Sequence, residues 1–490
     1  MAGERPLDKL RVYLRDLNPQ ARALLRAELE RAAARGDEVP GGTFILEELR
    51  RDPEEVPPAP KPAAMAPPAA AAAAAEPLAG ADRLGAAARY FFGPLEPFLI
   101  DEKLDQWHRG RVARAALEPV WQWICRDLIP TEAKGYIDEL ARLLLTNDRV
   151  ISERLARTFQ DLAAQRMRDA LAAVRDNVKA RQRLTGQLGM PRAVDHLGEI
   201  IGILRARDAL AVFASRLPAQ IKNLADEQLA NMRALLDSPV GGHPEVFVYA
   251  LILLMNRLTT PWQLVRLAVK AAESDVATKI LGTPYAVAVS IVIGDIERVL
   301  ALLREDVQRG RFAAASEALK DIHDAVRFLR SELDLSGDSQ WARQLTAIRS
   351  EISNLVRREL DMVPGRMRRL LRPRKPNEMH REAVLDGSEV QETEALIEFA
   401  SVCRNYASEL AINEVTLRVH TELQNYLETG TSPLLDGLRN SEEAHRSFRQ
   451  SQVDAAVRFA GKVFGASYAS LLAKAAEVAA QGTERKSAKG

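Results

Sequence analysis

The sequence predicts an all-α protein, and three observations lead to that prediction. Alanine and leucine supply most of the apolar side chains, and aromatic residues make up only 5% of the 490 residues, a composition that favours helix over strand. A capping residue followed directly by proline recurs along the chain, as it does at helix starts. No stretch shows the alternation of apolar and polar side chains that a strand produces. We expect an elongated multi-helix bundle or an irregular, α-solenoid-like body with a small tethered N-terminal helical module.

Residues 1–51 form the predicted N-terminal module. Its first helix has an apolar face whose residues recur at helical spacing. These residues are Leu7, Leu10, Leu14 and Leu17. A segment of about fifty residues buries little apolar surface by itself. We therefore expect the module to dock through these leucines, either on the rest of the chain or on another protein.

Residues 52–81 form the predicted linker. Their sequence, DPEEVPPAPKPAAMAPPAAAAAAAEPLAGA, is rich in proline, which can neither sustain a helix interior nor donate to a sheet. Alanine offers too little apolar surface to offset the entropy of ordering. The linker is therefore predicted to be flexible, and a flexible tether lets two parts of a chain engage partners semi-independently.

The rest of the chain is too long for a single compact core, since cores stop growing near ~250–300 residues. Its least helical stretch, residues 237–244, reads DSPVGGHP. This stretch predicts a boundary between a helical subdomain at 82–240 and a second one with long helices at 241–482. A further interruption is expected at residues 364–387, and residues 483–490 are predicted to be a disordered tail.

Two local patterns refine the second subdomain. The stretch GRFAAASEALKDI, from Gly310 to Ile322, resembles the glycine turn of tetratricopeptide-type helical hairpins. No second copy follows at the period of that family, so we interpret the stretch as a single helix–turn–helix. Ser388 and Gln391 form a capping box, which predicts a helix that continues to Glu428.

The most unusual charge run is GRMRRLLRPRKP, which has no acidic residue. Because the whole chain carries 68 basic and 67 acidic residues, any attraction for a polyanion has to be local. One interpretation is an anion site for nucleic acid, anionic lipid or an acidic partner helix. The other is a solvated helix end whose arginines pair with acids elsewhere. The basic residues are Arg366, Arg368, Arg369, Arg372, Arg374 and Lys375.

Aromatic residues gather between positions 90 and 123. They include the phenylalanines of FFGPLEPF, at residues 91–98, and three tryptophans. Core packing explains such a cluster. However, the two prolines and the glycine predict an irregular segment near the surface, where aromatic side chains form a groove for a partner segment.

Motifs that carry known chemistries are missing from the sequence. It contains no phosphate-binding loop, serine elbow, HExxH or EF-hand spacing. Glu442 and His445 make one Glu-x-x-His pair, whereas a helical di-iron site needs two such pairs. Cys125 and Cys403, the only cysteines, stand far apart in the sequence. We therefore predict a protein that is not an enzyme and that has no cofactor or metal.

The longest apolar runs, Val246–Met255 and Tyr285–Ile293, fall well short of the ~20 residues that a spanning helix needs. The first residues, MAGERPLDKLRVYLRD, lack the apolar core of a secretory signal. Two cysteines in so long a chain suit a reducing compartment. These features predict a cytoplasmic protein, and the excess of arginine over lysine indicates a bacterial one.

Together these observations predict a cytoplasmic helical scaffold or adaptor. Its tethered module and its large body would bind other proteins, and self-association is a further mode that the sequence leaves open. The alternative hypothesis is a helical protein that binds an anionic surface through residues 366–375. A third class, an enzyme whose site is assembled from scattered residues, would require converging polar groups in a deep pocket.

Overall fold

The computed structural model confirms the all-α class. It describes residues 85–487 with gaps at 103, 105–106, 191, 336–338, 376–377 and 379–382. The chain divides into two units between Pro77 and Leu78, and all described residues belong to the second. The predicted module with Leu7, Leu10, Leu14 and Leu17, and the predicted linker, lie outside the described residues.

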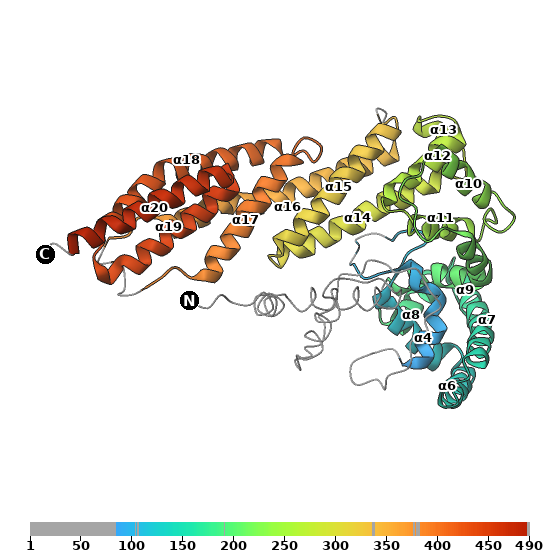
Figure 1. Cartoon of the computed structure of the whole chain (residues 1–490). Helices are drawn as coiled ribbons and strands as arrows, with labels where there is room; N and C mark the ends of the chain where they lie inside the picture. Colours follow the sequence, from blue (N-terminus) through green and yellow to red (C-terminus); the bar gives the residue numbers. More distant parts are fainter. Residues whose placement is uncertain are drawn as a thin grey trace, which may run out of the picture. The chain divides into compact units, whose positions relative to one another are not determined.

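Seventeen α-helices make up most of the described residues (Figure 1). The first ten are α4 (Ala86–Phe92), α5 (Leu117–Trp123), α6 (Pro130–Leu145), α7 (Arg149–Val174), α8 (Val178–Leu188), α9 (Ala193–Arg216), α10 (Asp226–Leu236), α11 (Phe247–Met255), α12 (Val265–Ala272) and α13 (Ala277–Leu281). The rest are α14 (Ala286–Gln308), α15 (Phe312–Glu332), α16 (Gln340–Leu371), α17 (Gly387–Asn405), α18 (Asn413–Arg439), α19 (Glu443–Phe464) and α20 (Ala466–Ser487).

Short segments of other types connect these helices. Strands β1 (Leu99–Ile100) and β2 (Val112–Ala113) pair in parallel, with Leu99 opposite Val112. The 3₁₀ segments are η1 (Gly93–Phe98), η2 (Arg114–Ala116) and η4 (Pro261–Leu264), and η3 (Ile124–Leu128) is a single π-helical turn. None of the helices in the described part of the chain combines the length and the apolar character that crossing a bilayer requires.

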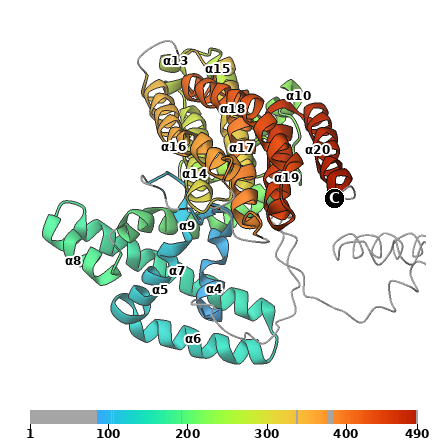
Figure 2. The same ribbon diagram turned by 90° about the vertical axis from the view of Figure 1, so that its left-hand side faces the viewer.

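Helix α9 lies at the centre of the first group of helices. Its apolar residues are mostly buried, whereas Asp195, Arg205 and Asp208 are exposed. The helix packs against α5, α7, α8, α11, η1 and β2. Helix α6 packs on the other side of α7, and Figure 2 shows the two helices side by side. Leu197, Ile200 and Leu204 of α9 are fully buried in this core. Burial of such side chains contributes about 1.5–3 kcal/mol each.

The segment between β1 and β2 ties this group to α14. Glu102 pairs with Arg298 at 2.7 Å, and His108 pairs with Glu297 at 3.0 Å. Gly294 makes the approach of His108 possible, because a Cβ there would lie 2.9 Å from Nδ1 of the imidazole. The connection is thus formed by the partly buried ion pair of Glu102 with Arg298 and by contacts of His108 with Glu297 and Gly294.

Helices α14 and α15 form the helix–turn–helix that the sequence predicts. Gly310 joins them with φ of 68°, a left-handed conformation that glycine adopts at little cost. Helix α16 then packs along α14, and α17 packs along α15. The residues of 237–244 connect α10 to α11, and the boundary expected there between two subdomains stays a prediction.

Helices α16 to α20 pack against one another at the C-terminal end (Figure 1). The interruption predicted from Pro364 is wrong at its start, because α16 continues through Pro364 to Leu371. Proline inside a helix costs about 3 kcal/mol. Apolar side chains next to the proline and beyond it are buried, and their burial offsets that cost. They are Val363, Met367, Leu370 and Leu371. Helix α20 runs to Ser487, past the start of the predicted tail.

The single helix predicted from Ser388 to Glu428 is in fact two helices. Helix α17 ends at Asn405 and α18 begins at Asn413. Ala411 between them has φ of 58°, a strained conformation for alanine. Leu410 and Ile412 on either side of it are buried, so packing of these two side chains holds the turn.

A buried glutamine on α19 completes the C-terminal end of α16. Gln452 is fully buried, and its amide donates to the carbonyls of Leu370 and Arg372, both at 3.0 Å. The last carbonyls of a helix have no partner within the helix. Gln452 therefore satisfies two of them and joins α19 to α16.

We predict that Gln452→Ala destabilises the folded chain by about 1–3 kcal/mol, because it leaves buried carbonyls without a donor. Urea unfolding measures the loss. The matched control is Gln450→Ala on the same helix, which removes a bond to Asp454 outside the core and should have an effect below about 0.5 kcal/mol. Equal effects of the two substitutions would contradict the capping role.

Candidate functional site

A groove of about 310 Å³ lies between η1, α7 and α9, and we call it the α7–α9 groove. Its floor is apolar and buried, with Phe98 from η1, Ala156 from α7 and Leu210 from α9. Charged side chains stand at its rim. The other lining residues are Tyr90, Gly93, Pro94, Pro97, Glu153, Arg157, Gln160, Arg207, Asp208, Ala211, Ala214 and Leu253.

The aromatic segment lies differently from the prediction. Phe91, Phe92 and Phe98 are buried in the core and do not lie near the surface. Phe91 makes edge contacts with Phe92 and tilts against Trp121 at 5.4 Å between ring centroids. A groove adjoins this segment, but it is lined by half-buried Tyr90, Pro94 and Pro97 together with buried Phe98, and not by exposed phenylalanines. Phe91 and Phe92 thus pack in the core, whereas Tyr90 and the two prolines line the groove.

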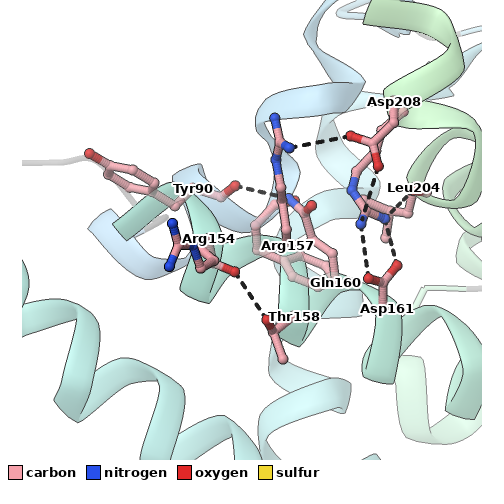
Figure 3. A network of polar contacts seen from close by, with 10 residues as sticks. Tyr90, Arg154, Arg157, Thr158, Gln160, Asp161, Leu204 and Asp208 are labelled. Atoms are coloured by element: carbon pink, nitrogen blue, oxygen red, sulfur yellow. Dashed lines mark hydrogen bonds and ion pairs between the residues drawn. The ribbon is translucent and has the colours of Figure 1, made fainter. Parts of the chain in front are cut away.

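Gln160 is the central polar residue of the groove (Figure 3). Its Nε2 donates to the carbonyl oxygens of Tyr90 at 3.2 Å and Phe91 at 2.9 Å. These two bonds fix the amide, because a carbonyl accepts only from the NH₂ side. The other atom, Oε1, is buried and has no hydrogen-bond partner among the described residues.

Two arginines connect α7 and α9 at the rim. Arg207 donates to both carboxylate oxygens of Asp161, at 2.7 and 2.9 Å, and its Nε is buried without a partner in the described part of the chain. Arg157 faces Asp208 at 3.6 Å, and both side chains are exposed (Figure 3). The first pair fixes the distance between the helices, whereas the second contributes little, as exposed pairs do.

Close to the groove, four large apolar side chains are exposed around the turn between α6 and α7. Leu145 is 89% exposed and Val150 68%, and we name the set the α6–α7 patch. The turn itself is well formed, since Asp148 caps α7 by accepting from the backbone N–H of Ile151 at 3.1 Å. The patch consists of Leu144, Leu145, Val150 and Ile151.

The predicted anion-binding residues lie at the end of α16 and in the segment after it. Three of them pair with acids on neighbouring helices: Arg366 with Glu392 at 3.6 Å, Arg368 with Glu422 at 2.9 Å, and Arg369 with Glu389. Arg372 pairs with Glu378 at 3.2 Å. The guanidinium of Arg374 lies 4.9 Å from the ring centre of Phe448, and Lys375 is exposed. These arginines thus join α16 to α17 and α18 through ion pairs. Anion binding by this segment stays a prediction.

A buried polar cluster lies on another side of α9. The hydroxyl of Tyr249 donates to Glu199 at 2.9 Å, and the backbone of Gly110 also hydrogen-bonds this carboxylate. Burial raises the pKa of Glu199, and these hydrogen bonds oppose the rise. Burial lowers the pKa of His196, which bonds the backbone of Arg111. Both side chains hold the β1–β2 segment on α9.

We predict that Glu199 makes folding less favourable as pH rises. Its folded-state pKa lies above the ordinary value of 4.5, so its contribution to stability is present below that value and is lost as pH rises through the folded-state pKa. Urea unfolding of the unaltered chain and of Glu199→Gln, compared between about pH 4 and pH 8, isolates this group. The stability of the variant relative to the unaltered chain should increase with pH, and a constant difference would contradict the assignment.

The described part of the chain contains no cluster of side chains suited to binding a metal ion and no activated cysteine thiol. No set of three or more histidine, cysteine or acidic side chains lies close enough there to hold a metal ion. Cys403 is buried, and burial raises the pKa of both cysteine thiols. A protonated thiol is a weak nucleophile.

Sequence patterns do not reveal the polar residues of the groove. Gln160 and Arg207 are single polar positions inside amphipathic helices, and their pairing across α7 and α9 depends on tertiary packing. Comparison of the chain with protein-family models, with curated proteins and with solved structures found no match. The site is therefore interpreted from its own geometry.

Proposed function

We propose that the protein is a non-enzymatic helical scaffold or adaptor, and that it binds another protein through the α6–α7 patch. The observation that carries this proposal is the exposure of the patch, where Leu145 is 89% exposed. Contiguous apolar side chains on the surface of a soluble protein mark interaction sites. Removing such surface from water contributes about 25 cal/mol per Å² of apolar area.

Part of the patch adjoins the α7–α9 groove along α7. Val150 of the patch lies three residues before Glu153 at the rim of the groove, so these two side chains are neighbours on the helix. Apolar side chains of a partner on the patch would bring the adjoining part of that partner to the groove. The predicted N-terminal module would add a second attachment, since a tether raises the local concentration of whatever the module binds.

The alternative, binding of an anionic surface through residues 366–375, has less support. Arg366, Arg368 and Arg369 are paired with carboxylates of α17 and α18. A phosphate would have to compete with those carboxylates for each guanidinium. Location in a bacterial cytoplasm remains part of the proposal, supported by the composition of the chain.

We predict that Leu145→Glu combined with Val150→Glu abolishes recovery of those partners, among the ones that the unaltered chain retains in crosslinked cells, that bind the α6–α7 patch. The charges oppose burial of the patch, and both positions are exposed enough to leave the fold intact. Quantitative mass spectrometry of the recovered proteins is the measurement. The control is Leu471→Glu with Val478→Glu, an equally exposed apolar pair on α20. Loss of partners from the control variant alone would contradict the proposal.

We also predict that Leu10→Asp combined with Leu14→Asp, made in the full chain, removes a different subset of the retained partners, the ones that the module binds, and leaves the others. The two leucines belong to the predicted docking face of the module. The same mass-spectrometric comparison measures this effect. An unchanged partner list would mean that the module recruits no protein.

A further inference from the structure

Two residues that line the α7–α9 groove each have a buried polar atom without a hydrogen-bond partner among the described residues. Gln160 is 2% exposed, and the side chain of Arg207 is 9% exposed. The atoms concerned are Oε1 of Gln160 and Nε of Arg207. An unpaired buried polar atom is costly, so a ligand that supplies a matching group at either atom gains affinity.

The identity of these atoms determines the class of the ligand. Oε1 of Gln160 is an acceptor, because Nε2 is held by the carbonyls of Tyr90 and Phe91. Nε of Arg207 is a donor, and the other nitrogens of the guanidinium are held by Asp161. A ligand that satisfies both atoms must offer an N–H and an oxygen. The main-chain amides of a peptide carry both groups.

We propose that the groove binds an extended, apolar segment of a partner protein through its main chain. One N–H of the segment donates to Oε1 of Gln160, and one carbonyl accepts from Nε of Arg207. A helical segment does not fit, since its amides pair internally, and a lipid acyl chain has no N–H to donate. The proposal rests on the proposed function, because it gives the protein-binding face a defined ligand.

The apolar floor of the groove, and a rim that carries both acidic and basic side chains, favour a peptide segment without net charge. Phe98, Ala156 and Leu210 offer contact to small apolar side chains. The rim carries acids and bases together, so it favours neither sign of charge. The volume of about 310 Å³ lies at the lower end of ligand sites and suits a few residues of peptide.

Entry to the polar atoms requires the side chain of Arg157 to move. Arg157 lies one turn before Gln160 on α7, so the two side chains are neighbours. Its pair with Asp208 spans 3.6 Å, with the side chains 60% and 65% exposed. Exposed pairs of this kind contribute little, and a ligand can therefore displace Arg157 at low cost.

The test uses the full chain and two probes. One is a blocked tetrapeptide, acetyl-Leu-Ala-Leu-Ala-amide, and the other is its analogue in which the central amide N–H is replaced by an ester oxygen. Titration monitored by saturation-transfer NMR of the probe gives both affinities. We expect the ester to bind about five- to tenfold more weakly, as loss of one hydrogen bond predicts.

Three variants locate the binding. Ala211→Phe fills the groove from an exposed position and should abolish binding, whereas Val212→Phe, the next residue on α9 and outside the groove, should not. Arg207→Lys keeps the charge opposite Asp161 but lacks Nε, and should weaken binding of the amide probe about five- to tenfold.

Specific outcomes overturn the inference. Equal affinity for the amide and the ester would show that the groove does not hydrogen-bond the main chain of the ligand. Binding that persists in Ala211→Phe would place the probe elsewhere, and no binding at millimolar concentration would remove the site. In each case the Leu145→Glu, Val150→Glu variant still reports on the proposed function by itself, because its substitutions lie outside the groove.

Discussion

Burial of α9 is the constraint on which the first group of helices depends. Leu197, Ile200 and Leu204 of this helix are fully buried, and α5, α7, α8, α11, η1 and β2 pack against it. The polar groups on this helix are then forced into specific bonds. Glu199 and His196 hold the backbone near Gly110 and Arg111, and Arg207 holds Asp161 of α7. The packing of one helix thus positions both the β1–β2 segment and the groove.

Polar side chains of α7 and α9 line part of the groove. Arg207 of α9 forms a bidentate pair with Asp161 of α7, and Gln160 of α7 donates to the carbonyls of Tyr90 and Phe91 in α4. Within the part of the chain that the structure describes, Oε1 of Gln160 and Nε of Arg207 have no hydrogen-bond partner, which lowers stability by about 1–3 kcal/mol for each. A protein that retains such a cost near an exposed apolar patch has a physical basis for ligand recognition.

Local patterns were sufficient to predict the all-α class, the hairpin at Gly310 and the core packing of the aromatic residues near Phe91. They failed where tertiary packing outweighed a local signal. Pro364 signals a break, yet buried Met367 and Leu371 continue the helix beyond it. Ala411 carries no turn signal, and the turn there depends on burial of its two neighbours. The pairing of Arg368 and Arg369 with acids on α17 and α18 was one of two interpretations of the charge run, since sequence alone does not say which helices adjoin.

Site-specific photocrosslinking tests the central claim, that the face along α7 and α9 is where another protein binds. A benzophenone amino acid is placed in the full chain, in cells that produce it, at Leu145, Ala211, Arg368 or Leu471 in turn. The account predicts crosslinked adducts of the same partner from positions 145 and 211 and none of that partner from positions 368 and 471. Adducts from 368 or 471 together with their absence at 145 and 211 would contradict it.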